Sequence, residues 1–246
     1  MATAVGIMGE SGTGKTHSYK FLPPDKTFVF DCDKKGLSFR NWKALYNTES
    51  KNYFRTSDVK KDIIPMLRRI DKEEEFSHIK YVIIDTLNGI MVDDEINRMK
   101  EKAYDKWQDL AVSVYKLLDH VRSMRDDLII FCYFHTQDLL DDSGNHFYRI
   151  QTSGQKLQKI KLESKLPIVI MSMIEEGDLG KNNFYFETQA RKSTAKTPEG
   201  MFKEFRIPNN ALLVAKAIER YEGSATSLSD EKADDNKESS DEEKED

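Results

Sequence analysis

The residues with the most distinctive chemistry lie near the N-terminal end of the chain, in the sequence Gly-Glu-Ser-Gly-Thr-Gly-Lys-Thr. It fits the pattern G-x-x-x-x-G-K-[ST], whose glycines let successive backbone N–H groups face a phosphate. The lysine adds a positive charge on the terminal phosphates, and the last hydroxyl binds Mg²⁺. A chance glycine-rich turn is the alternative, but an apolar run precedes the loop and a plausible helix follows. We expect a site for ATP and Mg²⁺ at Gly9, Glu10, Ser11, Gly12, Thr13, Gly14, Lys15 and Thr16.

Two acidic positions follow apolar runs and complete this prediction. Asp85 comes directly after Tyr-Val-Ile-Ile, where a strand-ending carboxylate binds Mg²⁺ together with Thr16. Taken alone, Asp85 could be an ordinary turn residue. Asp33 follows a second apolar run and is the candidate for orienting the attacking water, whereas Asp31 is interpreted as a turn or supporting residue.

A third apolar run, residues 128–134, continues into His135, Thr136 and Gln137. Polar groups at the end of a strand beside the phosphate loop could contact the γ-phosphate, so His135 is a candidate sensor of that phosphate. A capped loop histidine remains the alternative, because lone histidines are commonly structural.

The elements that must position these residues are predicted from hydrophobic patterning. Apolar, β-branched runs at 3–8, 26–30, 79–84, 128–134 and 166–173 predict buried strands. They lack polar alternation, which is typical of a parallel sheet covered by helices on both faces. Residues 107–124 carry apolar side chains at steps of three and four, residues 182–189 alternate as an antiparallel edge strand, and residues 211–222 form a C-terminal helix.

Composition divides the 246-residue chain into two parts. Residues 224–246 hold ten Asp and Glu against three Lys, a local charge of −7, which leaves residues 1–223 at +2 of the total −5. The segment has no aromatic residues and almost no aliphatic ones, so we predict a disordered acidic tail after one ATPase domain at 1–223. It could be merely solubilising, or could compete with DNA for basic residues or attract a basic partner.

Two cysteines, Cys32 and Cys132, are too few for a disulfide framework or a cysteine-based zinc site. The N-terminal residues lack the basic and long apolar regions of a secretory signal, and no apolar run is long enough to span a bilayer. We expect a cytoplasmic protein with no membrane partner.

With these residues assembled, the chain resembles the RecA-like P-loop ATPases, and most closely the small phage-encoded recombination ATPases that act with single-strand annealing or single-strand-binding proteins. The resemblance covers residues 1 to about 220 and rests on the loop at 9–16 and the three strand ends carrying Asp33, Asp85 and His135. It implies a mainly parallel sheet flanked by helices, with an antiparallel edge extension. In this family the residue at Asp33 is usually glutamate, and the shorter side chain suggests slow hydrolysis or a nucleotide switch.

The resemblance also implies a mobile DNA-contacting loop after the sensor strand, and residues 138–155 fit it in position and glycine content. Aromatic and basic groups there could stack on bases and pair with phosphates of single-stranded DNA. A solvated loop followed by a helix with a lysine face is the alternative. The candidate DNA contacts are Phe147, Tyr148, Arg149, Lys156 and Lys159.

Cations that reach the ATP site of a neighbouring subunit are a further feature implied by the family. The basic stretch at 189–196 offers Arg191, Lys192 and Lys196 as trans-acting candidates, which would make hydrolysis depend on a homo-oligomer. A solvated basic turn is the alternative.

Our leading hypothesis is a Mg²⁺-dependent ATPase, with Lys15, Asp33, Asp85 and His135 as catalytic residues, acting on single-stranded DNA in phage-type recombination, annealing or replication. A homo-oligomer and a single-strand-binding or annealing protein are the expected partners. A nucleotide-gated DNA-binding or loading adaptor with little turnover is the second hypothesis. A P-loop kinase ranks below both, because few arginines lie in the candidate lid segments.

Overall fold

A single sheet with helices on both faces organises the computed structural model, which describes residues 1–98, 105–140, 143–152, 161–177 and 181–223. The strands are β1 (Thr3–Gly9), β2 (Thr27–Asp31), β3 (Tyr53–Arg55), β4 (Tyr81–Asp85), β5 (Ile129–Leu140), β6 (His146–Ile150), β7 (Ile168–Glu176), β8 (Asn182–Glu187) and β9 (Arg206–Pro208). The helices are α1 (Lys15–Ser18), α2 (Trp42–Leu45), α3 (Ile64–Lys72), α4 (Leu87–Asn97), α5 (Asp105–Arg122) and α6 (Ala211–Glu222).

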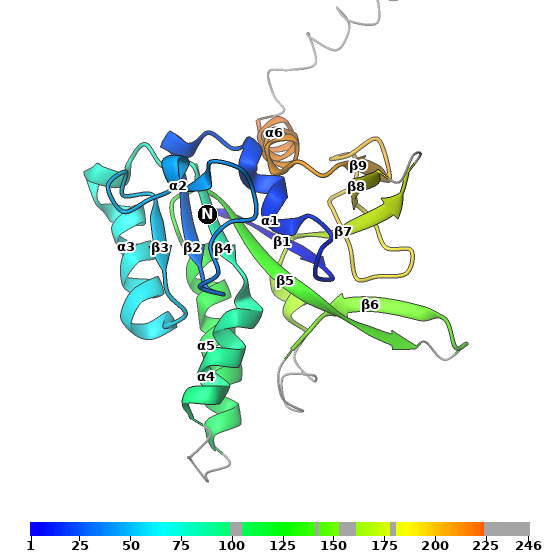
Figure 1. The fold of residues 1–246 in the computed structure, drawn as a ribbon, viewed down its shortest axis with the longest axis horizontal. Helices are drawn as coiled ribbons and strands as arrows, with labels where there is room; N and C mark the ends of the chain where they lie inside the picture. Colours follow the sequence, from blue (N-terminus) through cyan, green and yellow to red (C-terminus); the bar gives the residue numbers. More distant parts are fainter. Residues whose placement is uncertain (99–104, 141–142, 153–160, 178–180, 224–246) are drawn as a thin grey trace, which may run out of the picture.

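The strand order across the sheet is β3-β2-β4-β5-β1-β7-β8-β9, and β6 pairs with β5 outside this path (Figure 1). The pairs from β3 to β7 are parallel, whereas β8 and β9 add to β7 in antiparallel fashion. The predicted fold, a mainly parallel sheet flanked by helices with an antiparallel edge extension, is therefore confirmed. The outermost strand of that extension is β9, so β8 is not itself the edge.

The sheet separates two apolar layers, which explains why its central strands are apolar throughout. In β1, Ala4 and Met8 pack with α3, α4 and α5, whereas Val5 and Ile7 pack with α6 and the segment after α1. All seven residues of β1 and all five residues of β4 are buried. A strand covered on both faces has no solvent side for polar residues to occupy. Figure 1 shows α3, α4 and α5 on one side of the sheet and α6 on the other.

The helix predicted after the phosphate loop is present and is short. The α-helix α1 covers four residues and continues as a 3₁₀ turn at Tyr19–Phe21. Leu22 is already extended, with ψ at 144°, and Pro23 and Pro24 follow it. A proline disfavours helical backbone in the residue before it, so the consecutive prolines end this helix early.

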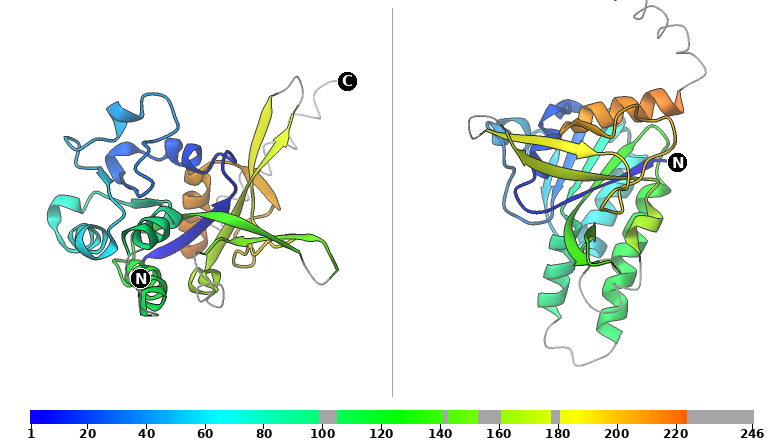
Figure 2. Two further views of the ribbon diagram at one scale, coloured as in Figure 1. Left: turned by 60° about the horizontal axis from the view of Figure 1, so that its bottom comes forward. Right: turned by 90° about the vertical axis from the view of Figure 1, so that its right-hand side faces the viewer.

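The strand predicted at 128–134 continues much further than expected. The strand β5 runs to Leu140 and pairs with β6 in an antiparallel hairpin, with Thr136 opposite Ile150. The expectation of an irregular loop across residues 138–155 is therefore wrong for 138–140 and 146–150, while 141–142 and 153–155 lie outside the described residues. The short segments at 136–140 (TQDLL) and 146–150 (HFYRI) do not alternate strictly between polar and apolar residues, so they lack the pattern that predicts a strand from sequence. Figure 2 shows this hairpin and the β7–β8 hairpin extending beyond the helical layers.

None of the helices in the described parts of the chain combines the length and apolar character that crossing a bilayer requires. Residues 224–246, predicted as an acidic tail, lie outside the described residues.

The central position of β5 leads to a prediction about stability. Phe131 is completely buried in the layer shared with Val5 and Ile7, so Phe131→Ala should lower the free energy of unfolding by about 3–5 kcal/mol. Leu140, at the far end of the same strand, is 66% exposed, and Leu140→Ala should change the free energy of unfolding by no more than about 0.5 kcal/mol. Urea unfolding of both variants measures the difference, and similar values for the two would contradict this account of the core.

Candidate nucleotide site at the carboxyl edge of the sheet

The phosphate loop leaves the carboxyl end of β1 and turns into α1 at Gly14. Gly14 has φ of +84°, a conformation that disfavours any residue with a Cβ atom. A Cβ atom there would also lie 2.9 Å from the ring of Phe184 on β8. The loop carbonyl of Thr13 accepts hydrogen bonds from Ser172 Oγ at 2.8 Å and Asn209 Nδ2 at 3.3 Å. The loop is thus held from β7 and from the residue after β9.

Lys15 lies inside this loop and is 6% exposed. Its Nζ donates to the carbonyl of Gly9 at 2.8 Å and to the carbonyl of Glu10 at 2.7 Å. Burial lowers the pKa of Lys15 from its ordinary value of 10.5 to about 8, although Asp85 partly opposes this effect. A phosphate anion beside the ammonium group would compensate its burial, which fits the predicted role of Lys15.

Asp85 lies at the carboxyl end of β4, is 3% exposed, and connects that strand to the phosphate loop. Its Oδ2 accepts hydrogen bonds from Thr16 Oγ1 at 2.7 Å and from Tyr19 OH at 2.9 Å. Its Oδ1 is buried and has no hydrogen-bond partner among the described residues. Burial raises the pKa of the Asp85 carboxyl, while the hydrogen bonds from Thr16 and Tyr19 lower it.

These two side chains fit a bound Mg²⁺ ion. The free carboxylate oxygen of Asp85 and the hydroxyl of Thr16 are oxygen donors, and Mg²⁺ is commonly held by one or two carboxylates together with substrate phosphates. Within the described residues, no group of three or more His, Cys, Asp or Glu side chains could hold a metal by itself. The donor set therefore suits a cation that arrives with a nucleotide.

Asp33 lies just beyond β2 and faces the same edge. Its Oδ1 accepts a hydrogen bond from Thr86 Oγ1 at 2.8 Å, and its Oδ2 lies 2.5 Å from Lys35 Nζ. Gly89, in the first turn of α4, leaves room for this carboxylate, because a Cβ atom there would lie 2.4 Å from Asp33 Oδ1. Asp31 is a supporting residue, since its Oδ2 accepts from the backbone N–H of Gly36 at 2.8 Å and from Tyr53 OH at 2.6 Å.

His135 is paired in register with Gly9 and lines the cavity beside the phosphate loop. Its backbone N–H donates to Asn88 Oδ1 at 2.7 Å, and Asn88 Nδ2 donates to the carbonyl of Gln151 at 3.1 Å. Asn88, in the first turn of α4, therefore joins the middle of β5 to the residue that follows β6. Burial lowers the pKa of His135, and the positive charge of Lys15 adds to this effect.

A cavity of about 480 Å³ lies where these groups meet. The predicted residues Ser11, Gly12, Gly14, Lys15, Thr16, Asp85 and His135 line it, together with His17, Lys35, Ser38, Thr86 and Phe184. Among the lining residues that were not predicted from the sequence are Lys35 and Phe184. The position of Lys35, two residues after Asp33, could have indicated it. Nothing in the sequence could have indicated Phe184, since it reaches the loop from a strand about 170 residues away.

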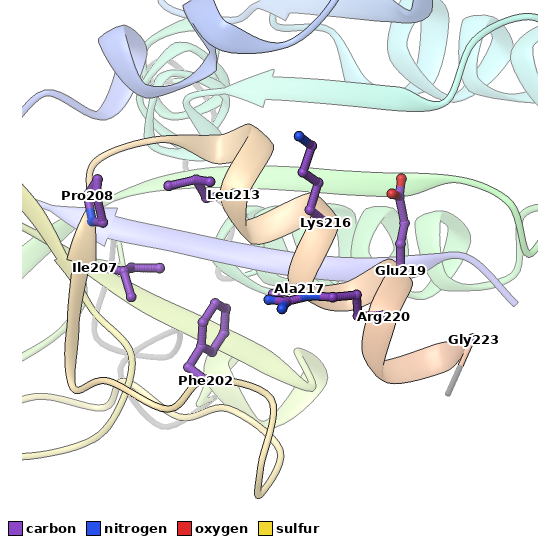
Figure 3. A pocket seen from close by; sticks show the side chains of 9 residues that line it. All are labelled: Phe202, Ile207, Pro208, Leu213, Lys216, Ala217, Glu219, Arg220 and Gly223. Carbon is purple, nitrogen blue, oxygen red and sulfur yellow. The ribbon is translucent and has the colours of Figure 1, made fainter. Parts of the chain in front are cut away.

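A second and larger cavity, of about 740 Å³, lies between α6 and β9 (Figure 3). Phe202, Ile207, Leu213 and Ala217 supply apolar lining, and charged side chains of α6 lie at its rim. Neither the phosphate loop nor any of the acidic residues discussed above lines it. We therefore place the candidate functional site at the smaller cavity, where the chemically active groups converge.

None of the three described candidate DNA contacts, Phe147, Tyr148 and Arg149, is fully exposed. Phe147 and Tyr148 are half-buried on β6, and Tyr148 packs against the core. Arg149 differs from the expectation that it meets phosphates, because its side chain is 15% exposed and its Nε lies 3.7 Å from Glu163 Oε1. This pairing turns the guanidinium group into the protein. Lys156 and Lys159 lie outside the described residues.

The basic stretch after β8 is exposed at its three candidate cations, Arg191, Lys192 and Lys196. The guanidinium group of Arg191 lies 3.8 Å from the ring centre of Phe205, a cation–π contact. The backbone of Lys192 accepts from the N–H of Tyr148, and that of Lys196 pairs with Val169. The stretch is therefore an ordered segment beside β6 and β7, and its action on another subunit stays a prediction.

The loop at 9–16 between β1 and α1, and the carboxylate of Asp85 beside Thr16, define a P-loop domain on a mainly parallel sheet. Residues 1–202 match the family model of the AAA domain, and the chain therefore belongs to this family. Among curated proteins, none matches the sequence. Among solved structures, a KaiC-like protein from the hyperthermophilic archaeon Pyrococcus horikoshii is similar at 14% identity, with a TM-score of 0.48 over 84% of each chain.

The buried ammonium group of Lys15 predicts a dependence of stability on pH. In the nucleotide-free protein its pKa is about 8, against 10.5 ordinarily, so between these values the unfolded chain binds more protons and stability rises with pH. Lys15→Met should be more stable than the wild type at pH 7, by up to roughly 3 kcal/mol. This difference should shrink as pH rises from 8 towards 10.5. Urea unfolding at several pH values, with Lys20→Met as a control outside the cavity, measures it, and a constant difference would contradict the prediction.

The two hydrogen bonds of Asn88 predict a local effect on stability. Asn88→Ala removes the acceptor of the His135 N–H and the donor to Gln151, and should cost about 1–3 kcal/mol. Asn97→Ala, at the exposed end of the same helix, should cost no more than about 0.5 kcal/mol. Thermal or urea unfolding compares the two variants. Equal losses would mean that the hydrogen bonds of Asn88 do not hold β5 and the end of β6 together.

Proposed function

We propose that this protein binds and hydrolyses ATP with Mg²⁺ at the cavity beside the phosphate loop. The observation that carries the proposal is the hydrogen bond from Thr16 to Asp85, with the second Asp85 oxygen buried and unpartnered. A buried carboxylate with a free oxygen needs a donor or a cation, and Mg²⁺ bound to ATP supplies one. Membership of the AAA domain family supports nucleotide binding.

The residues that line the cavity, together with Asp33 next to Lys35, have different roles in this reaction. Backbone N–H groups of residues 12–16 and the Lys15 ammonium hold the phosphates, while Thr16 and Asp85 hold the metal ion, whose charge offsets that of the phosphates. Asp33 orients water, whose oxygen forms a bond to the γ-phosphorus as the bond to the bridging oxygen breaks. ADP leaves with the electron pair of that bond, and the proton of the water passes to Asp33 and then to solvent. His135 contacts the γ-phosphate from β5.

We further propose that the protein acts on single-stranded DNA in phage-type recombination, annealing or replication, in the cytoplasm of a host. The support is the β5–β6 hairpin, which extends beyond the helical layers and begins next to His135 (Figure 2). Its strand β6 carries the half-buried aromatic side chains of Phe147 and Tyr148. Aromatic side chains can stack on bases. A homo-oligomer, in which Arg191, Lys192 or Lys196 reaches a neighbouring ATP site, and a single-strand-binding or annealing protein are the proposed partners.

One observation favours a second candidate function, a nucleotide-gated DNA-binding or loading adaptor with little turnover. Asp33 is one methylene shorter than the glutamate usual in the resembled family, and its Oδ2 is already occupied by Lys35. A carboxylate that reaches less far and is paired orients water poorly. ATP binding would then set assembly rather than drive repeated hydrolysis.

ATP hydrolysis by the purified chain tests these proposals. With Mg²⁺, the wild type should release phosphate, single-stranded DNA should raise the rate, and Lys15→Ala should reduce it on the order of 10²-fold or more. Lys20→Ala, a lysine outside the cavity on the next turn, is the matched control and should retain the wild-type rate. Phosphate release is measured with and without Mg²⁺ and DNA, at low and moderate salt.

Each remaining outcome separates the candidates. Turnover that DNA does not change would contradict the DNA role while leaving the ATPase in place. ATP binding without turnover would favour the adaptor. Full turnover or binding in Lys15→Ala would overturn the assignment of the cavity as the nucleotide site.

A further inference from the structure

The cavity contains a second lysine that the mechanism above does not use. Lys35 lines the same cavity as Lys15, and its Nζ lies 2.5 Å from Asp33 Oδ2. About half of its side chain, 54%, is exposed, whereas that of Asp33 is 14% exposed. The ammonium group therefore has room to move, while its carboxylate partner is confined.

The charge of Lys35 acts on the groups that would surround a terminal phosphate. Burial is the main cause that lowers the pKa values of Lys15 and His135, and the positive charge of Lys35 adds to both shifts. The same charge acts on Asp85, where it opposes the burial that raises the pKa of that carboxyl. Lys35 is thus close in space to the phosphate loop, the predicted metal ligand and the predicted sensor.

The loop after β2 directs the side chains of its two consecutive lysines, Lys34 and Lys35, to different places. Gly36 N–H is bound to Asp31, which fixes the end of the loop against its start. Lys34 has φ of +58°, and its Nζ lies 2.5 Å from Asp93 Oδ2 on α4. Lys34 is therefore directed to the helix, and Lys35 is the lysine of the pair that reaches the cavity.

We propose that Lys35 binds the γ-phosphate of ATP within its own subunit and exchanges Asp33 for this phosphate when the triphosphate binds. This inference rests on the proposed function. A terminal phosphate carries more negative charge than a single carboxylate, and exposed ion pairs contribute little to stability, so the exchange is favourable. ADP has no γ-phosphate, and with ADP bound Lys35 remains on Asp33.

The exchange has a direct consequence for hydrolysis. While Lys35 donates to Oδ2 of Asp33 and Thr86 donates to Oδ1, each oxygen of this carboxylate already accepts one hydrogen bond, which leaves fewer acceptor sites for water. When Lys35 moves to the γ-phosphate, Asp33 becomes available to orient the water, and the ammonium charge offsets the negative charge on the γ-phosphoryl oxygens. The same lysine then distinguishes ATP from ADP and prepares the carboxylate for the reaction.

Equilibrium binding of two nucleotides to the full chain tests the proposal. The probes are ADP and the non-hydrolysable imido analogue of ATP, each with Mg²⁺, measured by calorimetry. Lys35→Ala should weaken binding of the triphosphate roughly tenfold, the effect of losing one charge-assisted hydrogen bond, and change ADP binding less than about twofold. Lys35→Arg should recover part of the loss. Lys34→Ala, the neighbouring lysine directed to α4, is the matched control and should change neither.

A double-mutant cycle measures whether the effects of Asp33 and Lys35 on triphosphate binding depend on each other. An ion pair with only a structural role would show no such dependence. Asp33→Asn releases Lys35 from its partner, so triphosphate binding should become tighter. Part of that gain would come from removing a negative charge near the phosphate, and only the part that disappears in the Lys35→Ala background reports the exchange. Melting temperatures of all variants confirm that each is folded.

The outcomes separate this inference from the proposed function. Equal losses of ADP and triphosphate affinity in Lys35→Ala, no loss of either, or additive effects in the cycle would overturn the exchange while leaving the ATP site intact. A wild-type protein that binds neither nucleotide would overturn the proposed function, and this inference with it.

Discussion

The candidate site depends on the hydrogen-bond register of the parallel strands. Gly9 is paired with His135 across β1 and β5, and Asp31 with Asp85 across β2 and β4. Because parallel strands end at the same edge, this register brings the phosphate loop, the candidate metal ligand Asp85 and the candidate sensor His135 together. A shift of one residue along β4 would turn the buried Asp85 carboxylate to the other face of the sheet.

Around that edge, two buried groups of opposite charge lie beside the phosphate loop, and one of them, the Asp85 carboxylate, has an oxygen with no hydrogen-bond partner among the described residues. The Lys15 ammonium and one oxygen of Asp85 lie in low-dielectric surroundings, and the burial that lowers the pKa of Lys15 raises that of Asp85. The free protein holds Lys15 with loop carbonyls and Asp85 with hydroxyl groups. An anion and a cation arriving together would satisfy both residues, which is the property of a metal-bound nucleotide.

The supports of the site come from distant parts of the chain. Ser172 and Asn209 hold the carbonyl of Thr13, and Asn88 joins the backbone of His135 to that of Gln151. Through Asn88, the helix that follows Asp85 is bonded to the base of the β5–β6 hairpin. The candidate nucleotide site and the hairpin that carries Phe147 and Tyr148 are therefore connected by hydrogen bonds through Asn88.

The sequence by itself determined the fold class, most strands and the identity of the phosphate loop, because buried parallel strands are apolar throughout and the loop needs fixed residue types at fixed spacing. It also indicated Asp33, Asp85 and His135, since each lies at or just beyond the end of an apolar run. Only the tertiary structure decided that Lys35 and Phe184 line the cavity, that Arg149 is turned inward towards Glu163, and that residues 138–140 and 146–150 form a hairpin. These features depend on contacts between residues far apart in the chain or on short elements with weak periodicity, and local patterning carries no information about either.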